Sequence, residues 1–248
     1  MAQPQPAFTQ LTPHIYKLDL PYFGGRLPVG VFLVRDDNAA GGRGGWILVD
    51  AGAPGFVDTV LEQVSKVTGA QPPHLLVLTH GHLDHAAAAE AIRRRWKIPI
   101  AAGRDEITYL TGPAAYASIP AKSPIYRVAQ ISPPALVGRN VQIPLDDGMH
   151  LHGLQVVHAP GHAPGMVALL HAADRALLSA DVFYNLGGKL GDPAGLFTYD
   201  PALNHASQER LVALDFDHLI PSHGPAILNT GRQAAQAVVE GRNKKKKK

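Results

Sequence analysis

Short runs of consecutive apolar residues, bounded by glycine, proline or polar residues, recur along the first half of the chain. Runs of this length are typical of strands buried on both faces. Between them lie stretches with helical spacing of apolar positions and an alanine-rich stretch that ends in three arginines. The pattern predicts strands at 29–34, 46–49, 75–78 and 98–102, and helices at 56–67 and 85–96.

The second half of the chain returns to closely spaced apolar runs joined by short turns, a spacing that favours an antiparallel sheet. We expect strands at 141–143, 151–157, 166–170 and 176–179, then a helix at 201–214, a strand at 218–220 and a helix at 230–240. Two sheet-forming halves, each followed by helices, predict an α/β (α+β) fold. The expected architecture is a four-layer αββα sandwich, in which helices flank two mixed, mostly antiparallel sheets.

We expect a single domain at 1–243, with one segment that interrupts the pattern, followed by a short tail. The segment at about 104–139 is rich in proline and tyrosine, and we interpret it as an insertion that lies over a substrate site. The last five residues, 244–248, are all lysine, and we expect this tail to be disordered or foreign to the native chain.

Composition narrows the chemistry that is available. The chain has 13 histidines and no cysteine, which excludes disulfides, iron–sulfur clusters and thiolate ligands, so any metal must be held by histidine and carboxylate. Five of the 23 lysine and arginine residues lie in the tail. The rest of the chain has 18 basic and 20 acidic residues, a net charge of −2, which gives no sign of a nucleic-acid partner.

The segment Thr79-His80-Gly81-His82-Leu83-Asp84-His85 follows a predicted strand and begins a predicted helix. Side chains alternate along an extended segment, so His80 and His82 share one side and can bind one metal ion. Asp84 and His85 begin the helix and can face a second ion. A surface role for four such residues at this spacing is the weaker interpretation.

Three later polar residues also follow apolar strands. They are His162 in Ala159-Pro160-Gly161-His162, Asp181 in Ser179-Ala180-Asp181, and His223 in Pro221-Ser222-His223-Gly224. If these strand ends share one edge, they bring the three side chains to one place. Two metal ions held there would turn a shared water into hydroxide near neutral pH.

With this His-x-His-x-Asp-His motif and the three later segments in order, residues 14–240 resemble the metallo-β-lactamase-fold hydrolase superfamily. The resemblance implies that Asp181 bridges two metal ions. It also implies that Asp50, in Val49-Asp50-Ala51-Gly52, orients a ligand histidine. The implied ligands are His80, His82 and His162 for the first ion, and Asp84, His85 and His223 for the second.

Differences between branches of this superfamily refine the expectation. The β-lactam-hydrolysing branches use a cysteine ligand or lack the bridging aspartate, so β-lactamase activity is expected to be at most promiscuous. The flavodiiron branch has glutamate where this chain has His82, which favours zinc and hydrolysis. Glyoxalase II-like thioesterases share the ligand set but usually add a C-terminal helical region.

Tyr184, three residues after Asp181, resembles a lactonase tyrosine that polarises the substrate carbonyl, although a packing role is the alternative.

We therefore expect a dinuclear metal-dependent hydrolase that cleaves a carbonyl ester, lactone or thioester by attack of a metal-bridging hydroxide. Asp84 and Tyr184 are the expected catalytic residues, with Asp84 passing a proton to the leaving group. The alternatives are a phosphodiesterase or nuclease of the same fold, a mononuclear iron persulfide dioxygenase-like oxidoreductase, and a binding module without catalysis.

The expected cofactors are two Zn²⁺ ions per chain, with manganese, iron or cobalt possible. The expected partner is a small-molecule substrate, with no nucleic acid and no membrane, and the chain is expected to be a monomer or homodimer. The first ten residues carry no signal-peptide pattern, so the expected location is cytoplasmic.

Overall fold

The computed structural model describes the whole chain except residues 1–4, 26, 38–43, 70, 112–140 and 247–248. Most of the expected insertion at 104–139 therefore lies outside the described residues. Within the described part, no helix is long and apolar enough to cross a membrane.

Two large sheets form the centre of the molecule. The first has the strand order β1-β2-β3-β4-β5-β6-β7, antiparallel as far as β4 and parallel from β4 onward. Its strands are β1 (Phe8–Gln10), β2 (Ile15–Leu20), β3 (Val29–Asp36), β4 (Gly45–Val49), β5 (Leu75–Leu78), β6 (Ile100–Gly103) and β7 (Val141–Leu145).

The second sheet has the order β14-β11-β10-β9-β8 and is antiparallel except for the parallel pair of β11 and β14. Its strands are β8 (His150–Leu151), β9 (Leu154–His158), β10 (Val167–His171), β11 (Ala176–Ala180) and β14 (His218–Pro221). A separate hairpin joins β12 (Tyr184–Leu186) to β13 (Lys189–Gly191).

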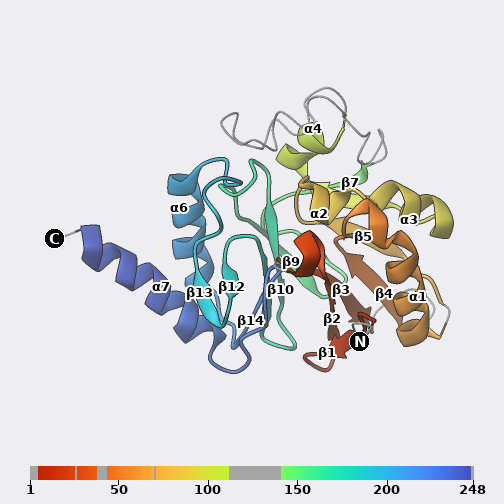
Figure 1. Ribbon diagram of the computed structural model, residues 1–248, viewed down its shortest axis with the longest axis horizontal. Helices are drawn as coiled ribbons and strands as arrows, with labels where there is room; N and C mark the ends of the chain where they lie inside the picture. The colour runs from red at the N-terminus through yellow and green to blue at the C-terminus, as the bar shows by residue number, and fades with distance from the viewer. Residues whose placement is uncertain (1–4, 26, 38–43, 70, 112–140, 247–248) are drawn as a thin grey trace.

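Helices cover the outer face of each sheet (Figure 1). Those against the first sheet are α1 (Val57–Thr68), α2 (Leu83–Ala86) and α3 (Ala89–Trp96), and those against the second are α6 (Pro201–Val212) and α7 (Gly231–Lys246). Short helical segments occur at η1 (Tyr22–Gly25), η2 (Pro54–Phe56), η3 (Arg104–Glu106) and α4 (Ile107–Leu110). The predicted four-layer sandwich is confirmed.

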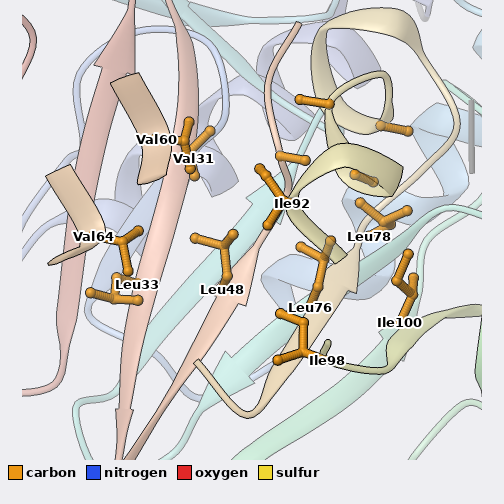
Figure 2. Packing of buried hydrophobic residues seen from close by; sticks show 14 of the residues in the cluster. Val31, Leu33, Leu48, Val60, Val64, Leu76, Leu78, Ile92, Ile98 and Ile100 are labelled. Atoms are coloured by element: carbon orange, nitrogen blue, oxygen red, sulfur yellow. The ribbon is translucent and has the colours of Figure 1, made fainter. Parts of the chain in front are cut away.

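Strand alternation explains why the apolar runs are continuous. In β3, Val31 and Leu33 face the helices of the first side, while Phe32 and Val34 face the second sheet. Figure 2 shows Val31 beside Val60 and Leu33 beside Val64, both valines of α1. Because both faces of the sheet are covered here, residues 29–34 of β3 contain no polar side chain, and polar residues appear only at its end.

Three elements differ from the sequence expectation. The helix expected at 85–96 is split, because Ala51 N donates to His85 O and Ala88 N to Gly52 O, so the loop after β4 interrupts the helix. The strand expected at 151–157 is a hairpin, since His152 and Gly153 form a turn with positive φ. The helix expected at 230–240 extends further, because α7 continues to Lys246.

Candidate metal centre

The seven predicted ligands converge at one edge of the sandwich. His80 and His82 follow β5, and Asp84 and His85 lie in α2. The loops after β9, β11 and β14 contribute the other three, His162, Asp181 and His223. Strands β9, β11 and β14 run in the same direction, so their carboxyl ends share this edge as the sequence predicts.

His80, His82 and His162 form the first group of donor atoms. All three residues are buried, and one ring nitrogen from each lies within 4.8 Å of the others. His82 Nδ1 is 2.9 Å from His162 Nε2. Imidazole nitrogens clustered in this way are suited to hold one transition-metal ion.

Asp84, His85 and His223 form the second group, again with donor atoms within 4.8 Å of one another. Asp84 Oδ2 lies 3.8 Å from His85 Nε2 and 3.5 Å from His223 Nε2. The Asp84 side chain is 14% exposed, whereas the two imidazoles are buried. The carboxylate is therefore the accessible member of this group.

Asp181 lies between the two groups. Its Oδ2 is 3.2 Å from His162 Nε2 on one side and 3.2 Å from His223 Nε2 on the other. Its Oδ1 is 3.5 Å from His85 Nε2. One carboxylate therefore reaches both groups, as an aspartate that bridges two ions must.

Several donor atoms in this cluster have no hydrogen-bond partner within the described part of the chain. They are the buried Nε2 atoms of His80, His85 and His223 and the Oδ1 atom of Asp181. Leaving buried polar atoms unpaired is costly, and an ion is one of the groups that can pair them. The residues present therefore fit a metal site.

Burial and neighbouring charges set the protonation of the cluster. Burial lowers the pKa of His82 to about 4 and holds the pKa of His80 and His162 well below the usual value. For His85, burial opposes protonation, but the nearby carboxylates, led by Asp181, outweigh it and raise the pKa. Neutral imidazole is the form that binds metal, so the lowered pKa values of His80, His82 and His162 favour metal binding near neutral pH.

Asp50 orients the start of the cluster, as the resemblance implied. Its carboxylate accepts the Nδ1–H of His85 at 2.9 Å and the backbone N–H of Thr79 at 2.8 Å. The Thr79 hydroxyl also donates to Asp50 and lies 3.0 Å from His80 Nδ1. Asp50 has a φ of 60°, a strained conformation that this bonding holds in place.

Other groups that orient the ligands carried no sequence signal. The Nδ1–H of His223 donates to the carbonyl oxygen of Pro28 at 2.9 Å, and His162 Nδ1 lies 3.3 Å from the Thr198 hydroxyl. A backbone carbonyl has no signature in sequence, and Thr198 lies in a loop without a motif. Sequence analysis therefore predicted the candidate ligands that the structure brings together, but it missed these partners.

Glu106 is a further residue that the sequence did not reveal. Its buried carboxylate accepts the backbone N–H of Gly81, between His80 and His82, at 2.8 Å. It also accepts the backbone N–H of Gly165, three residues after His162, at 2.7 Å. Burial raises the pKa of Glu106 to about 7, although the two N–H donors oppose this. The side chain joins two ligand-bearing loops.

Tyr184 is buried against the centre. Its hydroxyl donates to Asp181 Oδ2 at 2.8 Å, and its ring lies 4.4 Å from that of His223, centroid to centroid. Burial holds its pKa well above the usual value, so the hydroxyl remains a donor. Its role toward a substrate carbonyl stays a prediction.

Known proteins are similar to this chain in sequence. The chain is 29% identical to the probable metallo-hydrolase YybB of Bacillus subtilis over 88% of its own length and 91% of that protein. It is 25% identical to the hydroxyacylglutathione hydrolase GloC of Haemophilus influenzae, over 60% of this chain and 68% of GloC.

Solved structures are similar over nearly the whole chain. A metallo-beta-lactamase from Pontibacter korlensis has a TM-score of 0.69 at 17% identity and covers 95% of this chain and 99% of its own, which shows the fold. TTHA1623, solved in a di-iron-bound form, has a TM-score of 0.64 at 25% identity over 90% of this chain and 97% of its own. The sequence profile of the metallo-beta-lactamase superfamily matches residues 24–223, and the chain therefore belongs to this superfamily.

Proposed function

We propose that the chain is a dinuclear metal-dependent hydrolase that cleaves a carbonyl ester, lactone or thioester. The proposed ligands are His80, His82 and His162 for one ion, Asp84, His85 and His223 for the other, and Asp181 for both. The observation that carries the proposal is the place of Asp181, within 3.2 Å of a nitrogen from each group. Zinc is the proposed ion because imidazole and carboxylate ligands suit it.

Two divalent ions at this place would supply an acidified water and an electrophile for a carbonyl oxygen. The protein residues have separate tasks around them. Asp181 accepts the Tyr184 hydroxyl, which fixes the orientation of the carboxylate between the two groups. Asp84 is the carboxylate open to solvent and can accept a proton from water and donate it to the leaving oxygen or sulfur. The acyl bond to that atom breaks as water adds to the carbonyl carbon.

The choice of a carbonyl substrate has two supports. GloC is named as a hydrolase of hydroxyacylglutathione, an acyl compound, and YybB as a probable metallo-hydrolase. The body of the chain has a net charge of −2 without its lysine tail, which does not favour the polyanionic substrate of a nuclease.

A hydrolysis panel tests this proposal. The zinc-loaded protein is assayed with lactones, thioesters, simple esters, β-lactams and phosphodiesters. We expect turnover of at least one carbonyl class and little turnover of β-lactams. The variant His80→Ala/His82→Ala should lose at least 1,000-fold in kcat/KM, because two ligands of one ion are removed.

The matched control is His150→Ala/His205→Ala, which changes two histidines outside the cluster and should keep wild-type activity. Turnover of phosphodiesters alone, or full activity of the His80→Ala/His82→Ala variant, would contradict the proposal.

A further inference from the structure

Four histidines that the metal centre does not use gather at the opposite end of the sandwich. They are His14, His74, His152 and His171, which lie with Asp36 and Asp174 in two groups of potential ligands. His74 directly precedes β5, and the other end of β5 leads to His80. At the rise of an extended chain, six residues separate His74 from His80 by roughly 20 Å.

The group of His14, His171 and Asp174 is already saturated by hydrogen bonds. His14 Nδ1 lies 2.5 Å from Asp174 Oδ1, and His14 Nε2 lies 2.9 Å from Asp37 Oδ2. Asp174 also accepts the Thr12 hydroxyl and the His14 backbone N–H. Both ring nitrogens of His14 are thus hydrogen-bonded, so this group links His14 to Asp174 and Asp37 without an ion.

The group of Asp36, His74 and His152 is different. Asp36 Oδ2 lies 2.9 Å from His152 Nδ1 and 3.4 Å from His74 Nε2. Within the described residues, His74 Nε2 is buried and has no hydrogen-bond partner. Ligand atoms that hold zinc tetrahedrally at 2.0–2.1 Å are about 3.4 Å apart, which is close to these distances. The three atoms occupy positions suited to three corners of a metal site.

The surroundings also suit an ion. A cavity of about 320 Å³ borders His74 and His152 and is also lined by Trp46, Gln71 and Pro72, which leaves room for a water as fourth ligand. Burial, followed by the neighbouring His152, lowers the pKa of His74, which favours the neutral imidazole. Neutral imidazole with one carboxylate selects transition-metal ions over magnesium or calcium.

The backbone holds His152 in place for this contact. His152 has a φ of 51° in the turn between β8 and β9, and Gly153 follows with a φ of 82°. Left-handed backbone is unfavourable for a residue with a Cβ atom, and such strain is often kept at functional positions. The turn places His152, from the second sheet, against Asp36 at the end of β3 in the first.

We propose that Asp36, His74 and His152 form a separate mononuclear site for a divalent transition-metal ion such as Zn²⁺ or Co²⁺. The ligand atoms are Asp36 Oδ2, His74 Nε2 and His152 Nδ1. Asp36 ends β3 and His74 precedes β5 of the first sheet, whereas His152 lies in the turn between β8 and β9 of the second. The bound ion would therefore link the two sheets at the end opposite the candidate metal centre.

Metal binding to the full chain, prepared without a polyhistidine tag, tests this site. The metal-free protein is dialysed against Zn²⁺, and bound zinc is counted by elemental analysis for wild type and His74→Gln/His152→Gln. Wild type should bind one more ion per chain than this variant, and His150→Gln/His205→Gln should match wild type. Zinc should raise the Tm of wild type by more than that of the variant.

A milder variant guards against misfolding. His152→Asn removes one ligand, and asparagine tolerates the left-handed backbone at this turn. We expect its affinity for the additional ion to fall at least tenfold while zinc-dependent activity stays unchanged. Equal zinc content in wild type and His74→Gln/His152→Gln, or unchanged affinity in a folded His152→Asn, would overturn the proposal. A failure of hydrolysis in every assay would leave this ion count unaffected.

Discussion

Buried imidazoles of the candidate metal centre have hydrogen-bond partners that fix the orientation of their rings. Asp50 serves His85, and the Pro28 carbonyl serves His223. Such partners restrict the ring to one orientation and one tautomer, so that the other nitrogen faces the ion. The hydroxyl of Tyr184 plays the same part for the Asp181 carboxylate.

Removing the Tyr184 hydroxyl tests its role directly. We expect Tyr184→Phe to keep its metal ions and its fold but to lower kcat about 100-fold, with a smaller change in KM. The hydroxyl orients Asp181 in the resting site and can donate to a carbonyl oxygen during turnover. Steady-state kinetics with metal analysis checks this, and Tyr16→Phe, in β2, is the matched control. An unchanged kcat would assign Tyr184 to packing.

At the residue scale, the convergence of the candidate ligands could be predicted because these histidines and aspartates follow the ends of strands. Asp50 was predicted through its motif, and the structure places it on His85. The carbonyl of Pro28 and the carboxylate of Glu106 could not be predicted, since only the folded chain brings them to the ligand loops.

At the scale of elements, the loops after β5 and β9 carry His80, His82 and His162, and η3 links these two loops. Glu106 bonds the backbone of both loops. The end of β6, just before η3, also approaches the loop after β9 closely, since a Cβ atom on Gly103 would lie 2.2 Å from the Gly165 carbonyl oxygen. A side chain larger than hydrogen at Gly103 would therefore push this loop away from β6.

Exchanging Glu106 for its amide tests whether this link positions the ligands. In Glu106→Gln, one side-chain oxygen becomes an NH₂ group that cannot accept a backbone N–H, so one of the two bonds is lost. We expect zinc affinity at the catalytic cluster to fall 10- to 100-fold. Competition with a chelator measures the zinc affinity. The control Glu62→Gln, on the exposed face of α1, should behave as wild type. Wild-type affinity in Glu106→Gln would show that the two loops keep the ligands in position without the Glu106 link.

The elements were predicted wherever one local pattern governs them. Residues 29–34 of β3 and all of β5 are continuous runs without polar side chains because both faces of the sheet are buried there. The boundary between α2 and α3 depends on hydrogen bonds from the distant loop at Ala51 and Gly52, which no local pattern reveals. The β8–β9 hairpin was missed because its apolar residues continue on both sides of His152 and Gly153.

At the scale of the whole molecule, the two sheets are linked at both ends of the sandwich. Candidate ligands from loops of both sheets meet at the edge that carries the candidate metal centre. At the other end, His14, which precedes β2, bonds to Asp174 of the turn after β10. The hydrogen bond from His14 to Asp174, followed by that to Asp37, raises the His14 pKa despite burial.

The His14 link predicts a pH-dependent stability. Its folded pKa lies above the unfolded value of 6.5, so its contribution is fully present below pH 6.5 and is lost as pH rises through the folded pKa. We expect His14→Gln to lower the free energy of unfolding by roughly 1 kcal/mol at pH 6. The loss should be smaller at pH 9. Urea unfolding at the two pH values measures both, and an equal loss at each would contradict the assignment.

The central claim is that two ions, joined by Asp181, make the catalytic edge a hydrolase. The most direct measurement is a titration of the metal-free His74→Gln/His152→Gln protein with Zn²⁺, following hydrolysis of the best carbonyl substrate. We predict that activity rises until two ions are bound per chain and then levels off, and that Asp181→Asn stays at least 1,000-fold less active at the same zinc concentration. Full activity with no metal, or with Asp181→Asn, would contradict it.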